Sequence, residues 1–470
     1  MIVMKFGGTS VENAAAFRRV ADIVAARREK VPIVVVSATG KTTDELVTLC
    51  LHASAGDQDE AKGLIDWIIK KHQKIVQDLG LREDELLSQV LAEAKKRLQD
   101  CCRAMMETGQ APAADRDALL GIGEFLSSRI LARFLESEKI PSQWVDARQF
   151  MMTDSSFGRA RPLVAESKKR IDPLITPLIS KGIVAVMQGF VGSDLEGHST
   201  TLGRGGSDYS ATLVAALTEA EAVEIWTDVD GVMTADPTLV PEARRIRRMT
   251  FQEASELAYF GAKVLHPATI LPAVEKGIPV YVLNSRRPRE GGTEILPALN
   301  PLPFPRGDYR RWPVKSIAYK EGLSVIMIKS TRMLMAYGFL AGIFEIFARY
   351  RTSVDLVSTS EVSVSVTIDN PEHLPQILKE LSEFAEVEVL ERKAIVCVVG
   401  ENIGRIPGTA ARIFGTLDDF RIHLISQGAS DVNISFVIDE EDIPAVVRRL
   451  HERIFAGELD TDIFALPVGA

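Results

Sequence analysis

Apolar residues in the first 300 positions form short continuous runs that alternate with longer stretches of helical spacing. The short runs are β-branched, as expected of strands buried on both faces, and they cover residues 2–6, 33–36, 184–190, 222–227 and 279–283. A further strand is expected at 143–145. Helical spacing covers residues 11–28, 61–79, 83–107, 115–136 and 209–217. Together these patterns predict an α/β domain in which helices cover both faces of a largely parallel sheet, an αβα sandwich.

The chain repeats itself beyond residue 313. The stretch IFARYRTSVDLVSTSEVSVSVTID begins at Ile346, and IFGTLDDFRIHLISQGASDVNISFVID begins at Ile413. Both copies read as helix, strand, turn and strand, and each has one more strand before it and one more helix after it. We therefore expect two βαββαβ units of about 70 residues each.

Residues 300–313 are rich in proline and include a glycine, which excludes a helix or strand interior. This stretch is interpreted as a linker. The predicted domains are then a first domain at 1–300, a linker at 301–315, and two repeat domains at 316–392 and 393–470.

Charge and composition narrow the class of protein. There are 55 Lys and Arg against 64 Asp and Glu, a net charge of −9, which argues against nucleic acid as a partner. The basic run at 244–248 has no aromatic residues within it and is interpreted as a solvated face. The start, MIVMKFGG, has no long apolar core, so we expect neither a signal peptide nor a membrane span. The four cysteines lack paired spacing, and we place the protein in the cytoplasm.

Two glycine turns near the N-terminus follow predicted strands. In KFGGTS, Lys5 can reach a transferring phosphoryl group, and Gly7 and Gly8 allow a phosphate to approach the backbone, although an ordinary strand-to-helix turn explains the motif equally well. The turn SATGKTT ends like a P-loop, but Val35 stands where that motif requires its first glycine. We reject the P-loop and keep Thr42 and Thr43 as candidate hydroxyl ligands.

The turn TLGRGGSD, residues 201–208, is the most informative local motif. Arg204 can hold a carboxylate through two parallel hydrogen bonds, and the N–H groups of Gly205, Gly206 and Ser207 can form an anion nest. An N-cap by Ser207 is the structural alternative, and it leaves the three glycines around an arginine unexplained. The motif favours an acidic substrate.

Weaker candidates follow in TDVDGV, where Asp228 or Asp230 can contact a nucleotide or orient its metal, and in FGAKVLHP, where Lys263 can balance phosphate charge. A plain turn and a surface lysine are the alternatives. His198 and His266 lack partners at zinc-site spacing, so no protein-held metal is expected. Mg²⁺ would arrive with a nucleotide.

Seven motifs occur in the order KFGGTS, SATGKTTDEL, GIGE, QGFVGSD, TLGRGGSDYSA, EIWTDVDGVMTADP and FGAKVLHPAT, and this series resembles the aspartate kinases of the amino-acid kinase family. The C-terminal repeat is similar to the paired ACT domains of the lysine-sensitive, single-function type. The resemblance implies transfer of the ATP γ-phosphoryl group to the β-carboxylate of L-aspartate, giving 4-phosphoaspartate for the lysine, threonine and methionine branches. Because a carboxylate is already ionised near neutral pH, no general base is needed.

The resemblance also implies roles for individual residues. For catalysis it implies Lys5, Arg204 and Asp208. For aspartate it implies Thr43, Glu124 at the ammonium, Arg204 at the α-carboxylate, Gly205, Gly206 and Ser207. For the nucleotide it implies Lys5, Gly7, Gly8, Ser10, Thr227, Asp228, Met233, Thr238, Lys263 and Val264. Relatives carry tyrosine at Met233 and arginine at Thr238, which puts the ATP affinity in question.

A lysine pocket between paired ACT domains is implied at Met333, Met335, Gly338, Phe339, Leu340, Ser353, Val354, Asp355, Ser360 and Glu361. Asp355 and Glu361 would bind the ammonium groups of the effector. Met335 and Ala336 replace a histidine and a serine of lysine-sensing relatives. ACT pairing implies a homodimer or a dimer of dimers.

Three alternatives compete with this assignment. Kinases of glutamate or N-acetylglutamate lack the ACT pair. A non-catalytic amino-acid sensor would have lost the charged site residues, but Lys5, Glu124, Arg204 and Asp208 are all present. A fused kinase and homoserine dehydrogenase would require a G-x-G-x-x-G unit, which we do not find.

Overall fold

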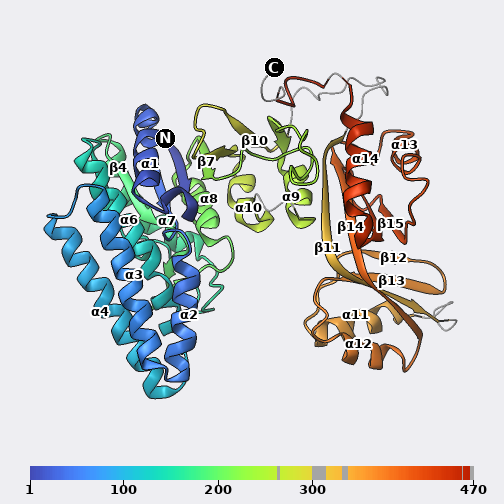
Figure 1. Ribbon diagram of the computed structural model, residues 1–470, viewed down its shortest axis with the longest axis horizontal. Coiled ribbons are helices and arrows are strands. Elements are labelled where there is room, and N and C mark those ends of the chain that lie inside the picture. The colour runs from blue at the N-terminus through green and yellow to red at the C-terminus, as the bar shows by residue number, and fades with distance from the viewer. Residues whose placement is uncertain (262–264, 299–313, 331–336, 458, 466–470) are drawn as a thin grey trace. The chain divides into compact units, whose positions relative to one another are not determined.

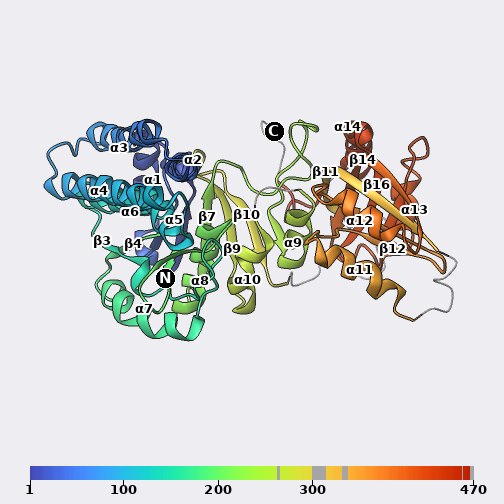
Figure 2. The same ribbon diagram turned by 90° about the horizontal axis from the view of Figure 1, so that it is seen from below.

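The computed structural model describes residues 1–261, 265–298, 314–330, 337–457 and 459–465, and the chain divides into two compact units (Figures 1 and 2). The first unit is Met1–Val232 with Val264–Pro297, and the second is Met233–Lys263 with Ala298–Ala470. The predicted first domain, 1–300, contains the segment 233–263, and the predicted linker lies almost wholly outside the described residues. The domain limits therefore stay predictions. Within the described part of the chain, no helix has the length and apolar character needed to cross a bilayer.

A largely parallel sheet forms the centre of the first unit. Its strands run in the order β3-β4-β2-β1-β7-β9-β10, and only β10 is antiparallel to its neighbour. Their bounds are β1 (Ile2–Phe6), β2 (Ile33–Val36), β3 (Ser142–Val145), β4 (Val184–Gln188), β7 (Ala222–Thr227), β9 (Val280–Asn284) and β10 (Gly292–Leu296), and a separate hairpin is formed by β5 (Val191–Ser193) and β6 (Ser199–Thr201). Every residue of β1, β2 and β4 is buried, so the prediction of a doubly covered parallel sheet is confirmed.

Helices cover this sheet, and α2, α3 and α4 lie side by side (Figure 1). The helices of the first unit are η1 (Gly8–Val11), α1 (Ala14–Ala26), η2 (Arg28–Lys30), α2 (Thr42–Ala55), α3 (Gln58–Asp78), α4 (Glu85–Thr108), α5 (Ala113–Leu120), α6 (Ile122–Ser137), η3 (Ala147–Gln149), α7 (Val164–Ile179), α8 (Gly206–Thr218) and α10 (Pro267–Glu275). Two sequence predictions were wrong in detail. The helix expected from residue 11 begins at Ala14, because the side chain of Asn13 accepts a hydrogen bond from Ala16 N. The helix expected at 115–136 is two helices that meet at Gly121.

The second unit is built on an antiparallel sheet in the order β12-β13-β11-β14-β16-β15. Its elements are β8 (Arg248–Thr250), α9 (Phe251–Tyr259), β11 (Val314–Lys329), α11 (Phe339–Arg349), β12 (Val357–Thr359), β13 (Ser363–Ile368), α12 (Leu374–Leu381), β14 (Glu386–Gly400), α13 (Thr409–Phe414), β15 (Leu424–Gln427), β16 (Asn433–Asp439), η5 (Glu440–Asp442) and α14 (Ile443–Phe455). Apolar side chains of α11 and α12, such as Phe347 and Ile377, pack on Ile326 and Val366 of the sheet. The repeated strand and helix order is confirmed.

The two repeats share their longest strands. Strand β11 runs antiparallel to β14 along its whole length, so that residues 314–320 pair with residues 395–400 and residues 325–329 pair with residues 386–390. The first half of β11 thus completes the strand set of the second repeat, although it precedes the first repeat in the sequence.

Candidate active site

The carboxyl ends of four neighbouring strands of the first unit meet at one edge of its sheet. Phe6 at the end of β1 is in register with Val36 of β2 and Trp226 of β7, and Val36 is in register with Gln188 of β4. The first two glycine turns predicted from the sequence directly follow β1 and β2, whereas the third follows β6 of the separate hairpin. Open α/β sheets bind their ligands at this edge.

Lys5 and Asp208 form an ion pair at this edge. Lys5 Nζ lies 2.6 Å from Asp208 Oδ1, and the two side chains are only 11% and 17% exposed. Asp208 lies in the first turn of α8, where a carboxylate is favoured by the helix dipole. A Cβ at Gly7 would lie 3.5 Å from Nζ, so glycine keeps the space beside this ammonium open. The structure thus brings together two of the predicted catalytic residues.

The first two glycine turns touch each other through their backbones. Gly40 N donates to Gly8 O at 3.0 Å, and a Cβ at Gly8 would lie 2.9 Å from the carbonyl oxygens of Ala38 and Gly40. Position 8 therefore accepts only glycine without movement. In the second turn Lys41 is exposed and Thr43 is half-buried at the start of α2.

Glu124 is buried beside the second glycine turn, and one of its carboxylate oxygens has no hydrogen-bond partner among the described residues. It belongs to the first turn of α6, and this turn packs closely against Ala38. Glycine at position 123 permits the close packing, because a Cβ there would lie 2.7 Å from Ala38 Cβ. Glu124 is 3% exposed, and its Oε2 has no partner among the described residues. Burial raises the pKa of Glu124 to about 7, while hydrogen bonds from backbone N–H groups, foremost that of Ala38, and the nearby charge of Lys5 lower it in part. A buried acceptor of this kind fits the ammonium group of an amino acid.

We expect the KM for aspartate to rise as the pH falls through about 7, because a protonated Glu124 no longer offers a negative charge to an ammonium group. Below that pH the increase should approach about tenfold per pH unit. Initial rates at varied aspartate between pH 6 and pH 9 measure this. In Glu124→Gln the KM should be high throughout and nearly independent of pH over this range, and an unchanged pH profile in that variant would assign the titration to another group.

The start of α8 combines two glycines with a predicted substrate ligand. Gly205 adopts a φ of +70°, and a Cβ there would also lie 2.7 Å from Thr269 Cγ2. A Cβ at Gly189, which follows β4, would lie 2.7 Å from Ser207 Cβ, so this glycine lets α8 approach the sheet edge. The N–H group of Ser207 belongs to the first turn of α8, where backbone donors lack helical partners and can bind an anion. Gly206 N, in contrast, donates to Gly203 O at 3.0 Å, so its place in the predicted anion nest is wrong.

Arg204 is exposed, and its guanidinium makes no hydrogen bond or ion pair with another described residue. It lines a cavity of about 380 Å³, together with Tyr209, Leu213 and His266. The structure therefore does not join Arg204 to the Lys5–Asp208 pair, although Arg204 and Asp208 belong to one motif at the start of α8. An unpaired guanidinium is available for a carboxylate.

On the nucleotide side, Ser10 and Thr227 are joined through a residue that the sequence analysis missed. Ser10 Oγ donates to Ser285 Oγ at 2.8 Å, and Ser285 Oγ lies 3.0 Å from Thr227 O. Next to it, Asn284 Nδ2 donates to Asp230 Oδ1 at 2.6 Å. Asn284 is the last residue of β9, which is in register with β7, and Ser285 follows it. Polar residues at the end of an apolar strand were the available signal.

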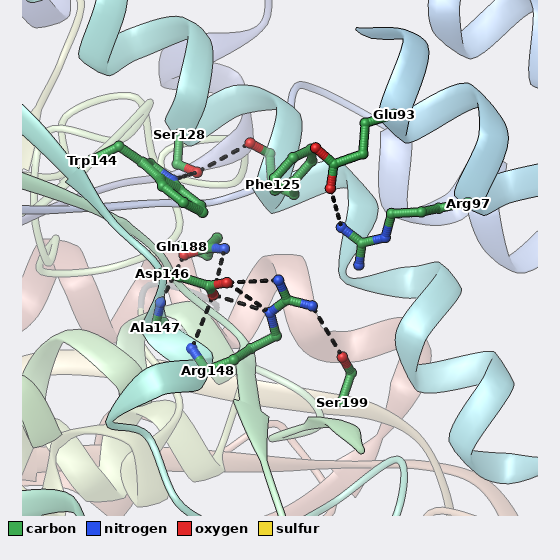
Figure 3. A network of polar contacts seen from close by, with 10 residues as sticks. All are labelled: Glu93, Arg97, Phe125, Ser128, Trp144, Asp146, Ala147, Arg148, Gln188 and Ser199. Atoms are coloured by element: carbon green, nitrogen blue, oxygen red, sulfur yellow. Dashed lines mark hydrogen bonds and ion pairs between the residues drawn. The ribbon is translucent and has the colours of Figure 1, made fainter. Parts of the chain in front are cut away.

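A network of hydrogen bonds and ion pairs holds Gln188, the last residue of β4, in place (Figure 3). Gln188 Oε1 accepts from Ala147 N at 2.9 Å, and Gln188 Nε2 donates to Asp146 Oδ1 at 3.1 Å. Asp146 also binds Arg148, with Nη2 2.6 Å from Oδ2. Trp144 on the neighbouring strand donates to Ser128 Oγ at 3.0 Å. These contacts fix the strand end that leads into Gly189 and so position the Ser207 backbone.

The contacts at this edge do not test the roles of the other predicted residues. Met233 and Thr238 belong to the second unit, where the Thr238 hydroxyl donates to Asp236 Oδ1 at 2.7 Å. Lys263, Val264, Met333 and Met335 lie outside the described residues. Their roles, and that of Asp228 at the end of β7, stay predictions.

The predicted effector residues that are described belong to the second unit, and they lie at residues 338–340, 353–355 and 360–361. Gly338 caps α11, Phe339 packs edge-on against Phe384 at 5.6 Å, and Val354 packs on the core beneath α11 and α12. Asp355 is almost wholly buried, and Leu340, Ser353, Ser360 and Glu361 are exposed.

Comparisons with known proteins agree with this geometry. The model of the amino acid kinase family matches residues 1–284, and an ACT domain model matches residues 396–454. The lysine-sensitive aspartokinase 3 of Escherichia coli is 38% identical over 97% of this chain and 99% of its own length. The chloroplastic aspartokinase 1 of Arabidopsis thaliana is 35% identical over 97% of this chain and 81% of its own length.

The chain belongs to the aspartokinases of the amino acid kinase family.

Two crystal structures of E. coli aspartokinase III share this fold. The complex with lysine and aspartate, in the T-state, has a TM-score of 0.79 at 37% identity and covers 97% of this chain and 99% of that chain. The complex with aspartate and ADP, in the R-state, has a TM-score of 0.80 at 37% identity and covers 97% and 100%. The α/β kinase fold with C-terminal ACT repeats is therefore confirmed for this family member.

Proposed function

We propose that this enzyme transfers the γ-phosphoryl group of ATP to the β-carboxylate of L-aspartate and so makes 4-phospho-L-aspartate, the first step towards lysine, threonine and methionine. The observation that carries the proposal is the buried Glu124, with an unpaired oxygen, near the Lys5–Asp208 ion pair. An ammonium site next to a phosphate-binding lysine is what a kinase of a small amino acid requires. The family membership and the aspartate in both related crystal structures support the substrate.

Each residue at the sheet edge would then have one task. Glu124 would bind the substrate ammonium, Arg204 would bind the α-carboxylate, and Thr43 and Ser207 would complete the aspartate site. Lys5 would neutralise charge on the transferring group, held in place by Asp208. Ser10, Thr227 and Asp228 would bind the nucleotide together with Gly7 and Gly8. Catalysis would consist of positioning and charge neutralisation.

ATP would bring Mg²⁺ with it, and the metal supplies charge neutralisation on the phosphates. Within the described residues, no cluster of three or more metal-binding side chains is found.

We further propose that L-lysine inhibits the enzyme through the ACT repeats, that two or four chains associate through them, and that the enzyme is cytoplasmic. The name of the E. coli relative and its complex with lysine support the choice of effector. An assay that is unaffected by millimolar lysine would contradict it, and inhibition by threonine would change the effector.

A coupled assay of ADP release tests the substrate. We expect turnover with L-aspartate and, at equal concentration, far slower turnover with L-glutamate, because one additional methylene displaces the reacting carboxylate from Lys5. A preference for glutamate would favour another amino-acid kinase. No turnover of any acidic amino acid by folded protein would favour a sensor.

A further inference from the structure

The first ACT repeat contains a buried carboxylate whose two oxygens have different surroundings. Asp355 Oδ1 accepts hydrogen bonds from the Tyr259 hydroxyl and from Lys320 Nζ, each at 2.8 Å. Asp355 Oδ2 has no partner among the described residues, although the side chain is only 2% exposed. A buried acceptor without a donor is unfavourable, so the site favours one additional donor.

The charges around Asp355 indicate that this donor is a cation. Lys320 Nζ also lies 2.8 Å from Asp369 Oδ2, so that one ammonium group serves two carboxylates. The three side chains together carry a net charge of −1. The two hydrogen bonds to the carboxylates raise the pKa of Lys320 in spite of the opposing effect of its burial, and Lys320 therefore stays charged.

In the second repeat, His423 occupies the position that Asp355 has in the first repeat. His423 N donates to Val437 O at 2.8 Å, just as Asp355 N donates to Thr367 O at 2.9 Å. There His423 Nε2 lies 3.1 Å from Asp439 Oδ1, and Lys393 Nζ lies 2.6 Å from the same oxygen. One carboxylate is thus matched by one lysine. Of these two described clusters, the one in the first repeat carries the surplus negative charge.

We propose that Lys320 is an internal competitor for the effector's ammonium group at Asp355 and that it sets the effector affinity of this enzyme. This inference rests on the proposed effector site. An ammonium group that donates to Oδ2 must come close to the ammonium of Lys320 on the same carboxylate, and like charges at this distance repel. Asp369 reduces the repulsion by drawing part of the Lys320 charge to itself.

Titration calorimetry of the full-length enzyme with L-lysine, without substrates, tests the proposal. We expect Lys320→Met to lower the Kd for lysine by about tenfold or more, because the repelling charge is removed while Tyr259 still holds Oδ1. Lys320→Arg keeps the charge and should stay within about threefold of the unmodified enzyme. Lys393→Met is the matched control, since it removes the corresponding lysine of the second repeat, and it should leave the Kd unchanged.

Asp369→Asn provides a second arm that does not depend on the folding of Lys320→Met, because Asp369 is 43% exposed. It leaves Lys320 bound to Asp355 alone and should raise the Kd several-fold. Suppose that the unmodified enzyme binds lysine. If folded Lys320→Met then binds lysine no more tightly than the unmodified enzyme, or if Asp369→Asn binds it equally well, the competition by Lys320 is wrong. The assignment of lysine as the effector would still stand. If neither the unmodified enzyme nor Lys320→Met binds lysine, the effector assignment itself fails and the competition fails with it.

Discussion

Replacing Lys5 by alanine should lower kcat by about 10³-fold, with a much smaller change in the KM for aspartate. The ammonium of Lys5 is the only charge of β1 at the catalytic edge, and it is held at 2.6 Å from Asp208 for use on a phosphoryl group. Its interaction with that group strengthens as negative charge develops, so that the loss appears mainly in turnover. Steady-state kinetics with saturating ATP measure the effect.

Two variants separate this effect from simple loss of structure. Lys5→Ala leaves Asp208 without its buried partner, which costs roughly 3–5 kcal/mol of stability. The double variant Lys5→Met with Asp208→Asn removes that unpaired charge, so its melting temperature should recover while its activity does not. Lys41→Ala, in the exposed part of the neighbouring turn, should change kcat by less than about twofold, since the P-loop interpretation was rejected. A kcat for folded Lys5→Ala within about tenfold of the unmodified enzyme would remove Lys5 from the mechanism.

Replacing Arg204 by alanine should lower kcat/KM for aspartate by about 10²-fold, mainly through KM, because a charge-assisted pair with the α-carboxylate is lost. Arg204 is exposed and its guanidinium makes no hydrogen bond or ion pair within the described structure, so its removal should leave the melting temperature unchanged. Initial rates at varied aspartate measure the effect. Arg204→Lys should recover only part of it, because a lysine cannot form the two parallel hydrogen bonds.

A modified substrate identifies the group that Arg204 binds. The α-amide of aspartate keeps the reacting β-carboxylate but lacks the α-carboxylate. If Arg204 binds the α-carboxylate, the alanine variant and the unmodified enzyme should use this compound almost equally poorly. An additional loss of about 10²-fold in the variant would show that Arg204 acts on the phosphoryl group or the β-carboxylate instead.

The parallel sheet was predictable because its strands are short, wholly apolar runs, and in an α/β chain such runs are typical of strands buried on both faces. The boundaries of the helices were harder to predict. Gly121 lies inside a regular helical period, and a glycine costs only about 1 kcal/mol in a helix, so the break between α5 and α6 has no clear sequence signal. Helix α7 contains Pro173 and Pro177, which sequence reasoning treats as breakers.

The residues of the candidate site were predictable as motifs, but their contacts were not. The sequence indicated Lys5 and Asp208 separately, and only the fold shows that they pair. It also placed Arg204 beside Asp208 in one motif, whereas the two side chains point to different surroundings. The cluster of Lys320, Asp355 and Tyr259 joins three distant segments, and the register shift between Lys320 and Leu323 could not be derived from alternation of apolar residues.

The pairing of β11 with β14 limits how the regulatory half can be exchanged between relatives. A graft that begins at residue 393 would bring residues 395–400 of β14 from the donor and pair them with the recipient's residues 314–320 instead of the donor's own. Side chains that do not match across this strand pair would weaken it, and a weakened pair exposes backbone donors and acceptors that associate with other chains. A chimera that changes sensitivity while staying monodisperse must therefore replace both ACT repeats together, starting before Val314.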